Sequence, residues 1–175
     1  VDGDFVGAVN LFYGQPGAPP SECDWQLHGC VFTVNEDSMH LPTCGPTMHF
    51  DEVTSAGNIL EAWGDDAHFV IDFPLTTEGS IPLQVDAARI RAIWQPGDDR
   101  LDDGILAGAV HKQTLLDSIA LLPPEIFPVS PELIKGMMDM FMPTDIDLDG
   151  DGVLDATSLA FTFSAKATTI SGLTT

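Results

Sequence analysis

Apolar and polar residues alternate along most of the first hundred positions, in short runs that end at glycine, proline and other turn-forming residues. Phe69, Ile71 and Phe73, for example, fall on one face of an extended chain, and we expect that face to point into the core. Helical spacing is rare in this part of the sequence. The pattern predicts a β-rich region over residues 1–101, with strands near residues 5–13, 29–34, 68–75 and 83–94.

The last of these runs has the pattern of a half-exposed antiparallel strand. Every second residue from Ala88 to Trp94 is apolar. Arg89 and Arg91 occupy the opposite face, where they meet solvent or acidic neighbours. We therefore expect the Trp94 side of this strand to be buried and the arginine side to be exposed.

The hydrophobic period changes after an acidic turn at residues 96–104. Apolar residues from Leu115 onward follow helical spacing until two prolines stop the run, which predicts a helix over residues 111–121. Ser130 and Pro131 are typical of a helix start, which predicts a second helix over residues 131–142. Residues 102–143 are therefore expected to form a helical pair.

The second helix carries an apolar face rich in methionine. Such a face more often fills a core than forms a groove for a lipid or a partner. We expect core packing, with the groove as the alternative. The residues concerned are Leu133, Ile134, Met137, Met138, Phe141 and Met142.

Strict alternation returns near the end of the chain. Leu159, Phe161 and Phe163 share one face, and small or polar residues lie between them. This pattern predicts a final strand in residues 157–175. The expected fold is a single domain over residues 1–175, mainly β with antiparallel, sandwich-like sheets, and with a pair of α-helices inserted before the last strand.

Composition adds a strong acidic bias to this picture. The 175 residues include 27 Asp and Glu against 6 Lys and Arg, a formal net charge of −21. A basic patch for nucleic acid cannot be assembled, whereas cations are suitable partners. The longest apolar runs are far too short for membrane insertion. We expect a secreted or cell-envelope protein, extracellular or periplasmic, in a processed form without its export signal.

Three cysteines lie in the first quarter of the chain. A hairpin centred on residue 37 would place Cys30 opposite Cys44, within reach of a disulfide. A bridge between Cys23 and Cys30 is the second choice, and three free thiols are the alternative to any bridge. An oxidising compartment favours the Cys30–Cys44 disulfide.

The strongest motif lies at residues 145–155, within an expected calcium loop over residues 144–156, and five aspartates occupy its eleven positions. These carboxylates repel one another unless a cation lies among them. Calcium binds six to eight oxygen ligands, and acids at alternate positions with glycine at the sharp turn suit that geometry. We predict a Ca²⁺ site in the loop, with a solvated acidic turn as the alternative. The predicted ligands are Asp145, Asp147, Asp149, Asp151 and Asp155, with a backbone carbonyl near Val153.

This run, read from Asp147 as D-x-D-x-D-G-x-x-D, resembles the calcium loops of thrombospondin type 3 repeats and, more loosely, those of dockerins and EF-hands. It departs from the EF-hand because Ala156 or Ser158 stands where a bidentate glutamate belongs. A strand, not a helix, is also expected to follow. A structural calcium site is therefore favoured over a sensor that opens a groove.

A wider resemblance covers the second half of the chain. The succession from Asp103-Gly-Ile-Leu-Ala-Gly-Ala-Val through two helices and the acidic loop to Ser158-Leu-Ala-Phe-Thr-Phe is similar to uncharacterised secreted or lipoprotein domains of myxobacteria and related bacteria. This resemblance implies an envelope or extracellular setting. It implies no activity.

A second metal-binding pattern lies among the cysteines, at His28, Met39, His40, Met48 and His49. Thioether sulfur with imidazole suits copper. The spacing matches no metal signature, and we expect these histidines to be surface or hydrogen-bonded residues.

No sequence signature of catalysis is present. The chain has no nucleophile elbow, phosphate-binding glycine loop, dinucleotide loop or kinase signature. Acids such as Glu22, Asp51, Glu52 or Glu61 cannot be assigned a catalytic role without geometry. We expect no enzymatic activity.

The sequence thus predicts a calcium-binding structural or adhesive module of the envelope or extracellular space. Its expected partners are the calcium ion and either copies of itself or another envelope protein. The alternative is an extracellular carrier of a lipid, a sugar or a copper ion, using the His/Met cluster or aromatic residues such as Trp25, Trp63 and Trp94.

Overall fold

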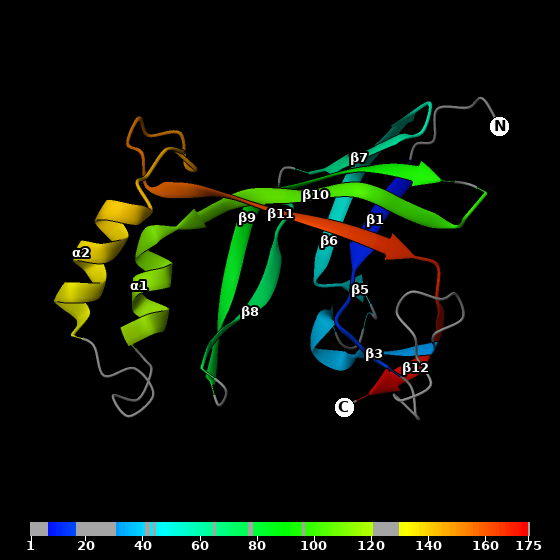
Figure 1. Ribbon diagram of the computed structural model, residues 1–175, viewed down its shortest axis with the longest axis horizontal. Helices are drawn as coiled ribbons and strands as arrows, with labels where there is room; N and C mark the ends of the chain where they lie inside the picture. The colour runs from blue at the N-terminus through cyan, green and yellow to red at the C-terminus, as the bar shows by residue number, and fades with distance from the viewer. Residues whose placement is uncertain are drawn as a thin grey trace. The chain divides into compact units, whose positions relative to one another are not determined.

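The structure is a computed structural model that describes residues 7–16, 31–40, 43, 45–64, 66–76, 79–95, 97–120 and 130–174 (Figure 1). The chain is mainly β with two α-helices that precede the final strands, as predicted. The elements are β1 (Gly7–Leu11), β2 (Gly14–Pro16), β3 (Val31–Asn35), the 3₁₀ helix η2 (Glu36–Ser38), β4 (Met39–His40), β5 (Gly45–Pro46), β6 (Met48–Ala56), β7 (Ile59–Trp63), β8 (Phe69–Thr76), β9 (Gly79–Gln95), β10 (Arg100–His111), α1 (Lys112–Ala120), α2 (Pro131–Phe141), β11 (Ala156–Lys166) and β12 (Thr169–Thr174).

The described strands form three sheets. The largest has the hydrogen-bonded order β1-β6-β7-β9-β10-β11, and β8 also pairs with β9. A second sheet has the order β12-β3-β2, and β4 pairs with β5 in the third. The expected final strand is therefore divided, because β11 joins the large sheet whereas β12 pairs in parallel with β3.

The chain divides into two compact units, each assembled from separate segments. The first contains residues 1–67, 89–106 and 162–175, and the second contains residues 68–88 and 107–161. In the first unit, Phe50 and Val53 of β6 are buried with Ala62 of β7 and with Ile90 and Ala92 of β9. Ile90 and Ala92 follow the period of two along β9, whereas Phe50 and Val53 are three residues apart on β6, where the register with β1 shifts between Gly7 and Val9.

The core of the second unit includes aromatic side chains. Phe69 of β8 is fully buried, and its ring meets the ring of Phe161 edge to face at a centroid distance of 6.4 Å. Val110 and Leu115 are buried with it. This unit also contains both helices and residues 145–155.

The burial pattern of β9 shifts by one residue near its middle. Leu83 and Val85 are buried before the shift and Ala88 after it, while Ala87 has a φ of 48°. A left-handed residue that changes the phase of alternation has the character of a β-bulge. The sequence pattern predicts the buried face from Ala88 to Ala92 correctly, but it gives no sign of the extra residue.

Trp94 departs from the expected burial, because its side chain is 47% exposed. It is the last residue of the predicted apolar face and lies one residue before the end of β9. Arg91, on the exposed face, pairs with Glu61 of the adjacent strand at 3.4 Å. The arginine side of the strand therefore lies where the alternation predicts.

The prediction of a helical pair over residues 102–143 is wrong at its beginning. Residues 100–111 form β10, and the helices occupy residues 112–120 and 131–141. Asp102 and Asp103 suggested a turn, but the Arg100 guanidinium pairs with Asp102 at 2.8 Å. The positive φ of 47° at Asp103 provides a local irregularity within the strand.

Helix α2 begins at Ser130 and Pro131 as predicted, but its apolar face is not buried as predicted. The Ser130 hydroxyl accepts a hydrogen bond from the Leu133 N–H, with Pro131 in the first turn. Met138 of α2 is buried, whereas Leu133, Met137 and Phe141 are exposed. The expectation that this face fills the core is wrong for these residues, because α2 packs on one neighbouring helix, α1. No helix in the described ranges is both long enough and apolar enough to cross a membrane.

We expect Gly108→Ala to destabilise the second unit. A Cβ at this position of β10 would lie 2.6 Å from the Asp86 carbonyl oxygen and 2.6 Å from Val85 Cγ1. Such overpacking costs about 1–3 kcal/mol. Thermal unfolding followed by circular dichroism should show a lower midpoint for the variant.

Gly136→Ala is the matched control, because a Cβ there meets nothing within 4 Å. Since alanine is about 1 kcal/mol more favourable than glycine in a helix, its midpoint should equal or exceed that of the wild type. Equal midpoints for Gly108→Ala and the wild type would contradict the close approach of β10 to the bulge.

Candidate metal centre

Residues 145–155 form a loop between α2 and β11 that is closed at its base by backbone hydrogen bonds (Figure 1). Ile146 and Ala156 form an antiparallel bridge, in which the Ile146 N–H donates to the Ala156 carbonyl and the Ala156 N–H donates back, both at 3.1 Å. Ala156 is completely buried. The two ends of the acidic segment are thus held side by side, whatever occupies the loop.

Asp145 secures the outer side of this base. Its carboxylate accepts a hydrogen bond from the Ser158 hydroxyl at 2.6 Å and one from the Ser158 N–H at 2.7 Å. The hydroxyl bond first, and then the backbone bond, lower the pKa of Asp145 below its ordinary value. Asp145 therefore ties the base of the loop to the start of β11, and we call this pair of hydrogen bonds to Ser158 the clamp.

Asp147 organises the turn of the loop from within. One of its carboxylate oxygens accepts the Gly150 N–H and the other accepts the Gly152 N–H, both at 2.8 Å. The two glycines have φ values of 75° and 91°, a region that glycine adopts without steric cost. The predicted sharp turn at these glycines is confirmed.

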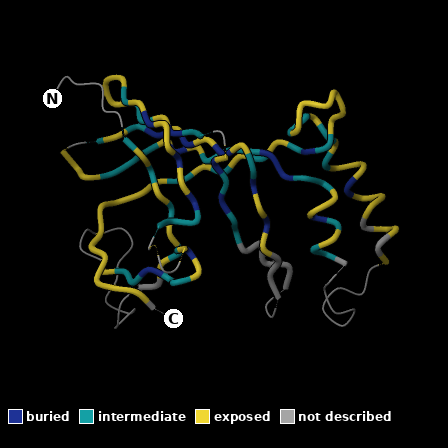
Figure 2. Tube along the Cα trace, turned by 180° about the vertical axis from the view of Figure 1, so that it is seen from behind, coloured by how far each residue is buried: buried dark blue, intermediate teal, exposed yellow. Residues whose placement is uncertain are grey.

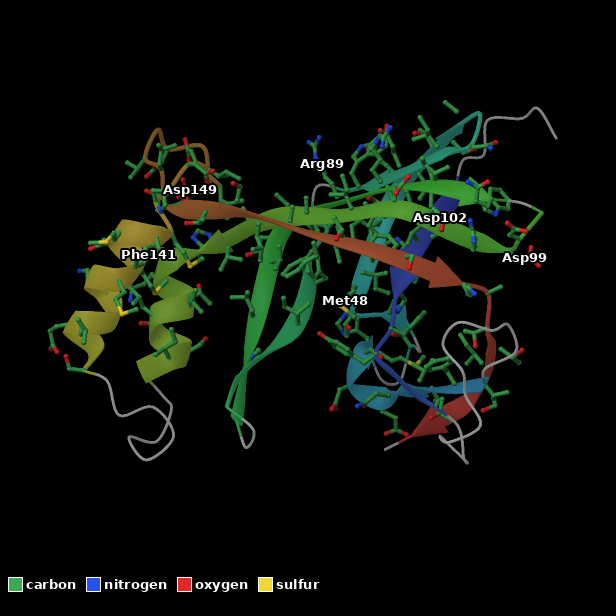
Figure 3. All side chains as sticks on the ribbon, in the orientation of Figure 1. Met48, Arg89, Asp99, Asp102, Phe141 and Asp149 are labelled. Carbon is green, nitrogen blue, oxygen red and sulfur yellow. The ribbon has the colours of Figure 1, made fainter. Side chains whose placement is uncertain are left out.

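Asp149 and Asp151 make similar short-range turns. The Asp149 carboxylate accepts the Asp151 N–H at 3.1 Å, and the Asp151 carboxylate accepts the Val153 N–H at 2.7 Å. These bonds fix side chains that are exposed to solvent. Figure 3 shows Asp149 on the loop beyond the end of α2 that carries Phe141.

The structure brings three of the five predicted aspartates together. Asp147, Asp149 and Asp151 each offer a carboxylate oxygen, and these oxygens lie within 4.8 Å of one another. Two oxygens that bind one calcium ion at about 2.4 Å can be at most about 4.8 Å apart. The all-oxygen donor set and its spacing therefore fit a hard divalent cation.

Asp155 stands apart from this triplet and connects the loop to α1. Its carboxylate accepts the Leu148 N–H at 3.2 Å and lies 3.4 Å from Nδ1 of His111. Its carbonyl accepts the Lys112 N–H at 3.3 Å. The predicted ligands Asp145 and Asp155 thus take part in hydrogen bonds that stabilise the loop, and Val153 contributes its N–H to the turn.

Two partners of the loop were not predicted from sequence. Ser158 and His111 contact Asp145 and Asp155, respectively. Both contacts depend on where the neighbouring strands begin and end, which alternation does not define to the residue. No local motif marks either residue.

The histidine and methionine pattern shows no comparable grouping in the part of the chain that is described. His49 lies 2.5 Å from the Asn10 side-chain oxygen, and Met48 is buried in β6. Among the described residues, the only group of three or more His, Cys, Asp and Glu side chains suited to one metal ion is the aspartate triplet. Cys23, His28, Cys30 and Cys44 lie outside the described residues, and the Cys30–Cys44 disulfide stays a prediction. The hairpin centred on residue 37 that favoured it is wrong, because β3 pairs with β2 and β12 whereas β4 pairs with β5.

No protein-family model, curated protein or solved structure matches this chain.

The clamp at Asp145 predicts a pH dependence of stability. Because its pKa is lower in the folded chain than in the unfolded chain, the unfolded state binds the proton first as the pH falls. This contribution should be complete above about pH 4, the ordinary range of an aspartate, and should be lost as the pH falls through the lowered pKa. Thermal midpoints measured from pH 6 to pH 2 in chelator should therefore fall more steeply in the wild type than in Asp145→Asn.

Ser158→Ala tests the cause of this effect, because it removes the hydroxyl that contributes most to the low pKa. In Ser158→Ala, as in Asp145→Asn, the thermal midpoint should fall less steeply between pH 6 and pH 2 than it does in the wild type. If the thermal midpoints of the three proteins fell in parallel with pH, the hydrogen bonds between Asp145 and Ser158 would not contribute to stability.

Proposed function

We propose that this chain is a secreted or cell-envelope structural and adhesive module, without enzymatic activity, that binds Ca²⁺ in the loop at residues 145–155. The observation that supports this proposal most directly is the triplet of aspartate oxygens within 4.8 Å of one another. Its turn is already shaped by hydrogen bonds from the Gly150 and Gly152 N–H groups. Binding therefore requires little reorganisation of the backbone.

Calcium would need further oxygen ligands beyond the triplet. Backbone carbonyls, such as that of Val153, the carboxylate of Asp155 and water would complete six to eight oxygens. Magnesium fits less well, because it prefers few carboxylates and retains several waters. The ion would neutralise carboxylates that otherwise repel one another in a chain of net charge −21.

The setting of the loop supports a structural role over a sensory one. A strand, β11, follows the loop where an EF-hand has its exiting helix. The loop joins α2 to β11, and its base is tied to the buried Ala156. A bound ion would therefore stiffen a connection between two elements of the second unit.

Calcium should stabilise the protein against heat. Binding to the folded state alone adds about 2.7 kcal/mol at a hundredfold excess over Kd, which raises the midpoint by about 5–10 °C for a chain of this size. Differential scanning calorimetry in excess calcium and in chelator measures this shift. Asp149→Asn and Asp151→Asn should lose most of it.

Asp103→Asn is the matched control. It removes the same charge from an exposed acid of β10 at a positive φ that asparagine also tolerates. Its calcium shift should equal that of the wild type. Equal wild-type midpoints in calcium and in chelator would show that the loop is an ordinary acidic turn.

A second candidate function, the extracellular carrier of a small ligand, is favoured by a cavity in the first unit. This cavity of about 450 Å³ lies at the exposed Trp94, with Leu60, Leu101, Ala165 and Ala167 as apolar lining and Asp99, Arg100 and Lys166 as charged lining. The volume lies within the range of small-molecule sites. Charges of both signs lie beside an exposed indole ring, which suits a neutral sugar that stacks on the ring and exchanges hydrogen bonds with the charged groups.

Arg100 supplies a donor at this cavity. Its Nε atom is buried and has no hydrogen-bond partner among the described residues, because the Asp98 carboxylate lies 3.9 Å away. A buried donor without a partner is costly, and because the Nε atom is closed to solvent, a ligand hydroxyl could satisfy it only after the side chain moves.

Binding to a glycan array of neutral and acidic oligosaccharides tests this second candidate. Neutral glycans should give signals that Trp94→Ala reduces at least tenfold. Trp63→Ala, a tryptophan of β7 that does not line the cavity, should leave them unchanged. An array with no glycan signal would exclude the sugar-carrier function.

A further inference from the structure

The outer face of α2 is an apolar stripe exposed to solvent. Leu133, Met137, Met140 and Phe141 are 58%, 51%, 74% and 72% exposed. They are spaced at i, i+4, i+7 and i+8, so that they lie along one side of the helix. Figure 2 shows most of the described α2 trace as exposed, and Figure 3 labels Phe141 near its end.

The stripe is uncharged. On a helical projection, Glu132, Lys135 and Asp139 lie on the remaining circumference, with Glu132 one turn before Gly136. Asp139 in fact forms an ion pair with Lys112 of α1. Four large apolar side chains without a charge among them form a surface that is unusual for an exposed helix.

A glycine interrupts the edge of this stripe. Gly136 lies between Leu133 and Met140 on the helix surface, and a Cβ there would meet nothing within 4 Å. Together with Met137, these residues form the four corners of a hole of the kind that receives a side chain from a facing helix. Because Gly136 has no side chain, the hole is open on that side and can accept a long, flexible side chain.

We propose that two copies of this chain associate through their α2 helices, packed antiparallel about a two-fold axis near Gly136 and Met137. In this arrangement Met137 of each copy fills the space over Gly136 of the other, and Leu133 of each lies opposite Met140 of the other. A parallel pair would instead place Met137 against Met137 and leave a gap between the glycines. The stripe is therefore complementary to itself in one orientation, as a two-fold interface requires.

The area of the stripe sets the strength of the association. Even complete burial of the four exposed side chains of each copy would cover on the order of 1,000 Å² in total, below the roughly 1,200–2,000 Å² of stable specific interfaces, so the contact is a weak one. The net charge of each copy opposes the approach of a second one. We therefore expect a dimer that forms at tens of micromolar protein and that strengthens with salt.

Sedimentation velocity of the full chain from 5 to 500 µM, in reducing agent so that cysteines cannot link the copies, tests this proposal. The average mass should rise from 18.7 kDa towards twice that value with concentration. Met137→Glu and Met140→Glu should remain monomeric at every concentration. Ile170→Glu, an equally exposed apolar residue of β12 changed in the same way, should associate as the wild type does.

Gly136→Ala separates the interface from the stability of the helix. It adds a methyl group where Met137 of the partner would pack, so it should weaken association at least tenfold while leaving the thermal midpoint equal or higher. The glutamate variants should also keep the wild-type shift of the midpoint in calcium, so that failure of the dimer and failure of the calcium site are distinguished.

Three outcomes would overturn the proposal. The first is a wild type that remains monomeric at 500 µM. The second is association of the Met137→Glu and Met140→Glu variants that is as strong as that of the wild type. Alternatively, Ile170→Glu alone abolishes association, which would assign the contact to the edge of β12.

Discussion

The pair of backbone hydrogen bonds between Ile146 and Ala156 is the constraint on which the second unit depends. It forces the chain to leave α2 and enter β11 at the same point, so the residues between them must turn back within a short loop. Four aspartates occupy that loop, and backbone N–H groups within it donate hydrogen bonds to their carboxylates. The bridge between Ile146 and Ala156 therefore holds these carboxylates close together, and a bound cation is the simplest way to offset their negative charge.

Burial on one face imposes a period of two on the sequence, which made β1, β3, β8, β9 and β11 predictable, whereas β6 and β7 of the large sheet were not predicted. The face from Ala88 to Ala92 is an example, since its alanines and Ile90 are buried as the alternation indicates. The phase change before Ala88 could not be predicted, because Ala87 has no side-chain feature that marks a left-handed residue. Strand β10 was missed in part because acidic residues that are common in turns also occur in a strand when an arginine pairs with them.

The site shows the same division between local and long-range information. The spacing of Asp147, Asp149 and Asp151 requires only a tight turn, and glycines at the correct positions identify that turn from sequence alone. The partners of Asp145 and Asp155 come from other elements, so they depend on tertiary contacts. The exposed stripe on α2 has the same origin, since the sequence predicts an apolar face but not which part of it a neighbouring helix covers.

The bulge in β9 has a consequence for how this strand tolerates insertions and deletions. Buried positions are odd-numbered before it and even-numbered after it, so the extra residue determines which side chains of the following segment point inward. Because the extra residue already offsets the alternation, loss of Ala87 would return the strand to a regular period of two, with Ala88, Ile90 and Ala92 still inward and Arg89 and Arg91 still outward. The strand can therefore lose one residue at this point without exchanging its two faces, which a regular strand cannot do.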